Sequence, residues 1–321
     1  MEKSPRLSVG RIPARAFATI AGFPRRFISR FFRLSMPVVL QSPSPLSSGD
    51  IESVRSLFGS ATYDMRAPNV AAIEWVHELP SELRVQLDAI CANLGLDYAW
   101  IPDEWTFGDF RVLAMDMDST LITIECIDEI ADFCGLKPQV AAITEASMRG
   151  EIKDFNESLT RRVELLKGLD ASVLERVYAE RLQLSPGAER MLKAVQAMGI
   201  RTLLVSGGFE FFTSRLQERL GLDRTRANTL EIVDGKLTGR VLGEIVNADV
   251  KAQTLKAFCQ DLGVTPQEAI AMGDGSNDLK MMGVAGLSVA FRAKPIVQAQ
   301  ADVAFNVVGL DGLLNLFPQQ Q

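Results

Sequence analysis

The sequence predicts an α/β fold: a Rossmann-like, mostly parallel sheet with an inserted helical cap and a small N-terminal α/β module. The mainly apolar runs Val112–Met115 and Thr202–Val205 are typical of strands that are buried on both faces of a parallel sheet. Helical stretches alternate with such runs, and this alternation indicates a sheet covered by helices. Residues 126–182 interrupt the alternation with a block of helical patterns, which predicts the cap.

The first segment is basic. Residues 1–36 hold eight Lys or Arg residues against one Glu, a net charge of +7, so the total of −6 leaves −13 for residues 37–321. An Arg-rich, acid-poor segment with interleaved Phe residues is typical of an organelle transit peptide, a basic amphipathic surface helix or a disordered extension. We expect a disordered extension. The acidic remainder argues against a nucleic-acid-binding surface on the main domain, so we expect no nucleic-acid partner.

The next segment, residues 37–105, has the pattern of a small α/β module. Its Ser- and Pro-rich part, residues 42–50, predicts a linker or loop. Helical patterns occur at 51–57 and 83–94, and extended patterns at 71–76 and 98–101. No set of residues typical of catalysis occurs in this segment, so the residues themselves leave its role unknown.

Capping and turn signals predict the later elements. Ser185 as the cap and Pro186 in the first turn predict a helix that runs to Met198 and ends before Gly199. A helix is also expected at 210–220. The dipeptide Asp234-Gly235 predicts a hairpin turn between strands at 229–233 and 236–241. Further strands are expected at 269–272, 287–291 and 303–307.

Composition excludes several classes of protein. No uninterrupted run of 18 apolar residues occurs, so we expect no transmembrane segment. The four cysteines include no Cys-x-x-Cys pair, which argues against a disulfide framework and a zinc site. The single histidine, His77, argues against a Ser-His-Asp triad and a multi-histidine metal site. Catalysis would therefore use carboxylates, lysine, hydroxyl groups and a hard cation.

Polar residues follow three of the predicted strands. Asp116 and Asp118 follow the first strand, Ser206-Gly207-Gly208 follow the second, and the sequence GDGSND at 273–278 follows a third. Lys251 opens a helix between the second and third groups. Because open α/β sheets bind ligands beyond the carboxyl ends of their strands, we expect these residues to meet at one edge of the sheet.

This set of residue types suits phosphoryl chemistry. Two carboxylates separated by one residue of a strand point the same way, and a third from Asp274 would add repulsion that Mg²⁺ relieves. One carboxylate can then act as a nucleophile and its neighbour as a proton donor. Ser206, two glycine N–H groups and Lys251 would hold the anionic oxygens. Each motif alone is common, so the interpretation depends on their order and their placing at strand ends.

The four motifs, in this order, resemble those of the haloacid-dehalogenase-like phosphohydrolases. The resemblance covers about residues 110–310 and implies a phosphatase domain at 109–317. Ser119 and the segment FNESLTRRVELLKG at 155–168 further resemble the members that hydrolyse phosphoserine. The resemblance implies Mg²⁺-dependent hydrolysis of O-phospho-L-serine to L-serine and phosphate through an aspartyl-phosphate, the last step of serine biosynthesis.

The resemblance also implies catalytic roles. Asp116 would be the nucleophile, and Asp118 would protonate the leaving group and then activate water. The ligands of Mg²⁺ would be Asp116, the backbone carbonyl of Asp118, and Asp274. Asp278 would support the metal and orient Lys251. The phosphoryl oxygens would be bound by Ser206, Gly207 and Lys251, with Asn277 nearby.

For the amino-acid part of the substrate, the resemblance assigns Glu125 to the ammonium group and Arg162 to the carboxylate, with Met148 and Phe155 on the cap side. The planar fork of Arg suits a carboxylate. The residues alone favour a different interpretation. Glu125 would interact with the N-terminus of a helix, and Arg162 would be an ordinary solvated residue on a helix. Because Arg162 is in the cap and Asp116 on the sheet, we expect the site to close when substrate bridges them.

Alternatives remain for the function and for the cellular location of the protein. The same motifs would serve a phosphatase or phosphotransferase acting on another small phosphomonoester, such as phosphohomoserine. A non-catalytic sensor is disfavoured because binding alone does not need both Asp116 and Asp118. The resemblance suggests a degenerate amino-acid-sensing or dimerisation module at 37–105, and a homodimer is expected. We expect a cytoplasmic enzyme, or an organellar one if residues 1–36 are a transit peptide.

Overall fold

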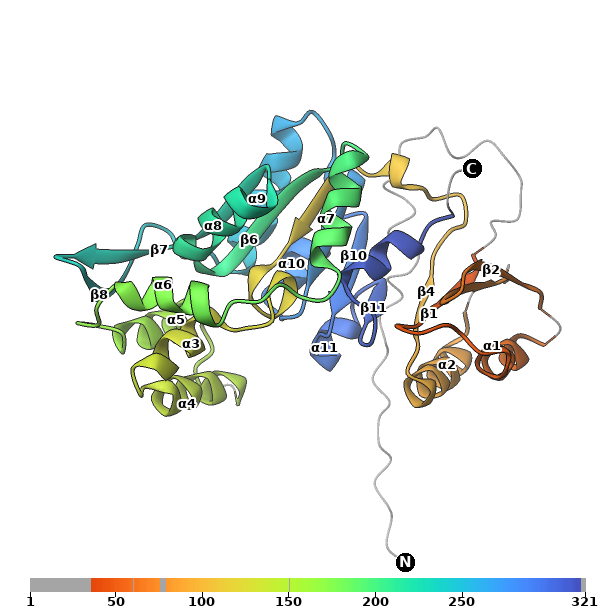
Figure 1. The fold of residues 1–321 in the computed structure, drawn as a ribbon, viewed down its shortest axis with the longest axis horizontal. Helices are drawn as coiled ribbons and strands as arrows, with labels where there is room; N and C mark the ends of the chain where they lie inside the picture. Colours follow the sequence, from red (N-terminus) through yellow and green to blue (C-terminus); the bar gives the residue numbers. More distant parts are fainter. Residues whose placement is uncertain (1–35, 60, 76–78, 150, 319–321) are drawn as a thin grey trace, which may run out of the picture. The chain divides into compact units, whose positions relative to one another are not determined.

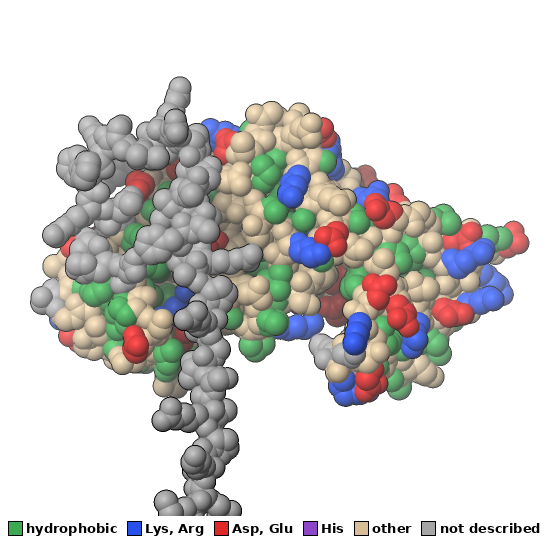
Figure 2. All heavy atoms as spheres, turned by 180° about the vertical axis from the view of Figure 1, so that it is seen from behind, with side chains coloured by type: hydrophobic (Ala, Val, Ile, Leu, Met, Phe, Trp, Pro, Cys, Tyr) green, Lys and Arg blue, Asp and Glu red, His purple; other side chains and the backbone are tan. Residues whose placement is uncertain are grey.

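The computed structural model of the chain describes residues 36–59, 61–75, 79–149 and 151–318 and contains two sheets (Figure 1). Almost all of the expected basic extension lies outside the described residues, and so does His77. Among the described residues, each helix is too short or too polar to cross a bilayer. On the face shown in Figure 2, acidic and basic side chains are interspersed over the right-hand part of the molecule.

The four-stranded sheet belongs to the N-terminal module. Its strands are antiparallel in the order β2-β3-β1-β4. The chain order β-α-β-β-α-β is that of a ferredoxin-like fold. Apolar side chains of two strands and two helices form its core. The elements are β1 (Val38–Gln41), α1 (Ser48–Arg55), β2 (Tyr63–Ala67), β3 (Val70–Ile73), α2 (Ser81–Leu94) and β4 (Asp97–Trp100).

The expected loop at 42–50 is only partly a loop, because α1 already begins at Ser48. Ser47 Oγ accepts a hydrogen bond from the Asp50 N–H (3.1 Å), and Asp50 accepts one from the Ser47 N–H (3.0 Å). This reciprocal capping box starts the helix before its apolar pattern does. Strands β1 and β2 were not predicted. The first three residues of β2, an edge strand, are exposed, so it lacks the apolar pattern of a strand.

The seven-stranded sheet has the order β11-β10-β9-β5-β6-β7-β8. Neighbours from β11 to β7 are parallel, and β8 pairs antiparallel with β7, which confirms the predicted α/β fold class and the hairpin. Strands β5, β9 and β10 are buried along their whole length. The strands are β5 (Val112–Met115), β6 (Arg201–Phe209), β7 (Arg224–Val233), β8 (Lys236–Leu242), β9 (Ala269–Gly273), β10 (Leu287–Phe291) and β11 (Val303–Phe305).

Helices cover both faces of this sheet, and each face has its own apolar cluster. Helices α7 (Ala188–Ala197) and α8 (Glu210–Leu220) pack on one face. On the other face are α9 (Ala248–Asp261), α10 (Leu279–Met282) and α11 (Pro295–Gln298). Short turns of 3₁₀ helix lie at Ser56–Phe58, Phe107–Asp109, Pro266–Glu268 and Leu310–Asn315.

An all-helical insert follows the first strand of the large sheet, as the helical patterns at 126–182 predict. It consists of α3 (Cys126–Phe133), α4 (Lys137–Met148), α5 (Phe155–Glu164) and α6 (Ser172–Glu180). In Figure 1 these helices lie together beside the β7–β8 hairpin, and α5 contacts β8. We call these four helices the insert.

Two predicted boundaries were wrong because of contacts distant in sequence. Helix α7 begins at Ala188, after Gly187 with a φ of 78°, and not with Ser185 as its cap. A Cβ on Gly187 would collide with the Asp311 side chain, so this position needs glycine.

The other boundary is the end of β11, which was predicted at 307 but lies at Phe305. The backbone N–H groups of the next three residues, 306–308, donate to the Asp97 carboxylate at 2.8–2.9 Å instead of continuing the strand.

Candidate active site

The carboxyl end of β5 positions Asp116 and Asp118. The Asp116 N–H donates to a carbonyl of β9 (3.0 Å), which continues the pairing of the sheet by one residue. The chain then turns through Met117–Leu121, where Ser119 has a φ of 54°. After this turn Asp118 Oδ1 accepts a hydrogen bond from the Cys126 N–H (2.9 Å) at the start of α3. The turn therefore holds both carboxylates at one edge of the sheet.

A buried lysine joins two carboxylates. Lys251, in the first turn of α9, has its Nζ 2.7 Å from Asp116 Oδ1 and 2.7 Å from Asp278 Oδ1. Burial alone would lower the pKa of Lys251, but the two carboxylates outweigh it and raise the pKa, so the ammonium group stays charged. The Asn247 side chain caps α9 through two backbone N–H groups and so helps to position Lys251.

Ser206, Gly207 and Gly208 lie within β6 at its carboxyl end, and not after the strand as expected. The pairing of β6 with β7 shifts register across these residues. Ser206 Oγ accepts a hydrogen bond from the Gly208 N–H (2.8 Å) and lies 3.4 Å from Asp118 Oδ2. A Cβ on Gly208 would collide with the Asp118 carboxylate, so only glycine permits this close approach.

Asn228 of β7, which sequence reasoning missed, orders the same segment. Its buried side chain donates from Nδ2 to the Gly207 carbonyl (2.7 Å) and accepts from the Val246 N–H at Oδ1 (2.8 Å). Because the Gly207 carbonyl and the Gly208 N–H share one peptide plane, Asn228 also sets the direction of that N–H. Asn228 precedes the predicted strand at 229–233, so no local pattern indicated this role.

Asp116, Asp274 and Asp278 form an acidic group, and each offers an oxygen within 4.8 Å of the others. Both oxygens of Asp278 are engaged, by Lys251 Nζ and by the Gly275 N–H (3.0 Å), whereas Asp274 Oδ1 accepts a bond from the Thr120 hydroxyl (3.3 Å). Burial, followed by the Asp278 charge, raises the pKa of Asp274 to about 7 and that of Asp116 well above its usual range. Only two of the three carboxylates pair with the Lys251 ammonium group, so the acidic group retains excess negative charge and fits a hard divalent cation.

The environment of Asp118 suits proton transfer. Burial, followed by the charge of Glu125, raises the pKa of Asp118 to about 7, and the Cys126 N–H acts in the opposite direction. A carboxyl group with this pKa changes protonation state near neutral pH, as a general acid and base must.

Glu125 lies close enough to Asp118 to affect its ionisation. It occupies the N-cap position of α3, but its side chain makes no capping hydrogen bond there. Its Oε1 accepts a bond from the Ser119 hydroxyl instead (2.7 Å). A helix-capping role therefore does not explain Glu125.

Arg162 differs from its neighbour Arg161. The Arg161 side chain is exposed and forms an ion pair with Glu157, one turn earlier on α5. The Arg162 side chain is half-buried, and burial lowers its pKa, while the charges of Glu125, Asp128 and Asp118 act in the opposite direction. The structure therefore brings Arg162 and Glu125 to the same acidic region, and Arg162 is not an ordinary solvated helix residue.

Two of the remaining predicted residues lie beside Gly207. A Cβ on this glycine would lie 3.0 Å from Phe155 Cζ and 3.8 Å from Asn277 Nδ2, so the aromatic ring of the insert and the amide of the sheet domain flank the same backbone. Met148 is the last residue of α4, and its side chain lies outside the described part of the structure.

Comparison with known proteins identifies the family. The family model described as "haloacid dehalogenase-like hydrolase" matches residues 110–286, more than half of the chain. The chain belongs to the haloacid dehalogenase-like hydrolases. The matched range contains every residue of the acidic group, together with Ser206 and Lys251.

Individual relatives within these hydrolases share much of the sequence. The chain is 57% identical to a phosphoserine phosphatase of Polaromonas sp. over 65% of its own length and 90% of that protein. It is 43% identical to a phosphoserine phosphatase of Streptomyces coelicolor over 92% of its length and 71% of that protein. A crystal structure of a probable phosphoserine phosphatase from Vibrio cholerae in its unliganded form superposes with a TM-score of 0.76 at 37% identity, covering 93% of this chain and 92% of that one.

Burial differs among the residues at this edge of the sheet in this haloacid dehalogenase-like hydrolase. Asp116 is 5% exposed, and Ser206 and Lys251 are 0% exposed. Asp118, Gly207, Gly208 and Asp274 are half-buried, so solvent reaches the site from their side.

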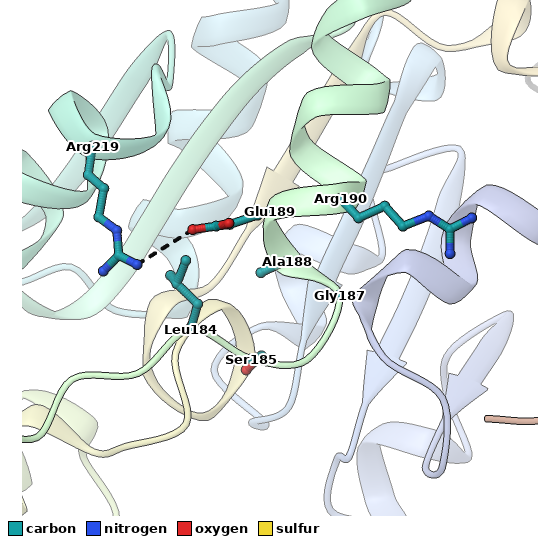
Figure 3. Close-up of a pocket in the computed structure, with 7 residues that line it drawn as sticks. All are labelled: Leu184, Ser185, Gly187, Ala188, Glu189, Arg190 and Arg219. Carbon is teal, nitrogen blue, oxygen red and sulfur yellow. Dashed lines mark ion pairs between the residues drawn. The ribbon is translucent and has the colours of Figure 1, made fainter. Parts of the chain in front are cut away.

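A separate surface pocket lies at the start of α7 (Figure 3). Arg219 reaches across it to Glu189 (3.6 Å), and Arg190 pairs with Asp311 (3.0 Å). The charged side chains of this pocket are thus paired with each other or with a neighbour, and none of them belongs to the acidic group. It is not the reaction site of this haloacid dehalogenase-like hydrolase.

Proposed function

We propose that this chain hydrolyses O-phospho-L-serine to L-serine and phosphate through an aspartyl-phosphate on Asp116. The Asp116 carboxylate is the observation that carries the proposal. Lys251 and the Met117 N–H hold its Oδ1, and no hydrogen-bond donor among the described residues contacts its Oδ2. The similarity to phosphoserine phosphatases supports phosphoserine as the substrate.

In the first step, Asp116 Oδ2 attacks phosphorus, and the bond between phosphorus and the seryl oxygen breaks. Asp118, in its protonated form, donates a proton to that oxygen and so releases serine. Ser206, Gly207 and Lys251 hold the phosphoryl oxygens as their charge redistributes.

In the second step, a water molecule attacks the phosphorus of the aspartyl-phosphate. The Asp118 carboxylate, now without its proton, accepts one from the water. The bond between Asp116 and phosphorus breaks, phosphate leaves, and Asp116 and Asp118 return to their starting forms.

The proposed cofactor is Mg²⁺, held by Asp116, Asp274 and the backbone carbonyl of Asp118, with Asp278 supporting Lys251. When bound, Mg²⁺ would neutralise carboxylate charge and polarise a phosphoryl oxygen. A thermal-shift measurement on the free protein tests this assignment. Added Mg²⁺ is expected to raise the melting temperature of the wild type, because a ligand of the folded state stabilises it, and to have little effect on Asp274→Asn. Equal shifts in both proteins would contradict the ligand set.

The amino-acid part of the substrate is assigned to residues of the insert and to Glu125 directly before it. Glu125 would face the ammonium group, and Arg162 would bind the carboxylate through its planar fork. Phe155 and Met148 would line the same side, and Asn277 would lie near the phosphoryl group. These assignments follow the resemblance to the family, and Phe155 and Arg162 lie in the segment 155–168 that carries it.

Steady-state hydrolysis tests the function directly. Phosphoserine, phosphohomoserine and a sugar phosphate would each be measured with Mg²⁺ and with a chelator. We expect kcat/KM to be highest for phosphoserine and activity to be lost on chelation and restored by Mg²⁺. An equal kcat/KM for the sugar phosphate would overturn the roles of Glu125 and Arg162.

The organisation of the chain completes the proposal. We place the phosphatase domain at 109–317, with its cap at about 126–182, and assign 37–105 a sensing or dimerisation role after a basic extension at 1–36. Gel filtration of the full chain with and without serine tests the module and the expected homodimer. Cell fractionation tests the expected cytoplasmic location against the organellar one.

A further inference from the structure

Ser119 lies in the turn after β5 and has a backbone conformation that is unfavourable for a residue with a side chain. Its φ of 54° is in the left-handed region, where the Cβ of an L residue comes close to the following carbonyl oxygen. Among the residues that the structure describes, only Asp234 and Arg292 share this feature without being glycine. Glycine at 119 would relieve the strain, so a contact of the serine side chain is needed to offset it.

The backbone of the same turn holds Glu125 from both sides. The Ser119 N–H donates to the carbonyl of Ile124, the residue before Glu125, at 3.2 Å. On the other side, the N–H of Cys126 donates to Asp118 Oδ1 at 2.9 Å. The position of the Glu125 backbone is therefore fixed, and only the torsions of its side chain remain to be set.

The Ser119 hydroxyl sets those torsions. It donates to Glu125 Oε1 at 2.7 Å, and within the described part of the chain no other group donates a hydrogen bond to this carboxylate. The Glu125 side chain is exposed and makes no capping bond with α3. Without the serine, such a side chain samples several rotamers, and a ligand that selects one of them loses affinity to conformational entropy. The hydroxyl restricts the carboxylate beforehand and leaves Oε2 open to a cation.

Arg162, the other residue proposed for the amino-acid part of the substrate, is oriented by a different contact. Its Nε donates to the carbonyl of Ser158, one turn earlier on α5, at 3.3 Å. Separate hydrogen bonds thus orient Glu125 and Arg162. A change in the Ser119 hydroxyl should therefore affect the recognition of an ammonium group more than that of a carboxylate.

We propose that Ser119 is a positioning residue that sets the preference for substrates with an ammonium group, because its hydroxyl holds the Glu125 carboxylate in the orientation that receives this group. The inference deepens the proposed function and rests on the role of Glu125 given there. One hydrogen bond of this kind changes a binding equilibrium by about 2- to 10-fold.

Two variants separate the hydroxyl from the backbone strain. Ser119→Ala removes the hydroxyl and keeps the unfavourable conformation, whereas Ser119→Gly removes the hydroxyl and relieves it. We expect Ser119→Gly to have a higher melting temperature than Ser119→Ala. If Ser119 acted only on the fold, activity would follow melting temperature. The proposed role instead makes both variants lose the same preference.

The preference is measured with phosphoserine and with its analogue that has hydrogen in place of the amino group, both with Mg²⁺. In both Ser119 variants, we expect the ratio of kcat/KM for phosphoserine to that for the analogue to fall by about 2- to 10-fold. The fall should come from a higher KM for phosphoserine with little change in kcat. On a Glu125→Gln background, Ser119→Ala should leave the ratio where Glu125→Gln alone puts it, because both act through one carboxylate.

Three results would overturn the inference: an unchanged ratio in both variants, a ratio that falls in Ser119→Ala but is restored in Ser119→Gly, and a further fall in the double variant. A wild type that hydrolyses the analogue as well as phosphoserine would instead overturn the proposed function. Urea unfolding of Ser119→Ala, Glu125→Ala and their double variant would then still decide whether the hydroxyl holds Glu125, because additive losses of stability would contradict the contact.

Discussion

At the scale of single residues, Asp116 and Asp278 share the Lys251 ammonium group, and Asp116 is the proposed nucleophile. Replacing Asp116 by Asn removes the nucleophile but leaves Lys251 its 2.7 Å contact with Asp278. We therefore expect Asp116→Asn to fold normally and to lose phosphoserine hydrolysis by about 10³-fold or more. Steady-state kinetics measure the loss of activity, and circular dichroism checks that the variant folds normally. Substantial remaining activity would contradict the aspartyl-phosphate mechanism.

A second prediction at this scale concerns Asn228. Asn228→Leu leaves the Gly207 carbonyl and the Val246 N–H without their partner in a buried place, and each such group costs about 1–3 kcal/mol. We expect a lower free energy of unfolding in urea and a kcat/KM reduced by about tenfold as the Gly208 N–H loses its direction. The control is Asn306→Ala, an exposed amide, which should change stability by less than about 0.5 kcal/mol. Equal losses in both variants would contradict the positioning role.

At the scale of elements, the hairpin and α5 meet at a glycine. Gly239 has a φ of 81°, and a Cβ there would lie only 3.0–3.3 Å from atoms at the end of α5, whereas Gly235 has a φ of 75° with open space around it. Alanine at 235 should cost about 1 kcal/mol for the backbone conformation alone. Alanine at 239 should cost about 1–3 kcal/mol more, because it also forces the hairpin away from α5. Urea unfolding of both variants compares the two costs, and equal costs would mean that the close contact adds nothing.

The sequence predicted elements well where local pattern decides them. The apolar run at Val112–Met115 and the turn Asp234-Gly235 lie where the pattern indicates. The start of α7 was wrong because it depends on Asp311, which is more than a hundred residues away. The early start of α1 follows from a capping box, a local signal that the apolar pattern alone does not contain.

At the scale of the whole molecule, Asp97 joins the N-terminal module to the large sheet. Its buried carboxylate accepts three backbone N–H groups from residues 306–308, so Asp97→Ala leaves all three without this partner, and that of Val308 is buried. We expect a loss of about 2–4 kcal/mol in the free energy of unfolding. Asp103→Ala removes an ion pair in which the Asp103 side chain is 42% exposed, and Arg66 keeps its bond to the Leu316 carbonyl, so we expect a cost of about 1 kcal/mol or less. Chemical denaturation compares them, and a small loss for Asp97→Ala would mean that the module is held by other contacts.

The sequence by itself determined which polar residues meet at one edge of the large sheet. Asp116, Ser206 and Asp274 lie at or next to the ends of parallel strands, and local periodicity is enough to place those ends on one edge of a sheet. Only the tertiary structure decided how these groups are held: Lys251 is buried between two carboxylates, and Asn228 holds the Gly207 carbonyl. The reason is physical, because these contacts join residues far apart in the chain, and their energies depend on burial and hydrogen-bond geometry that no local pattern encodes.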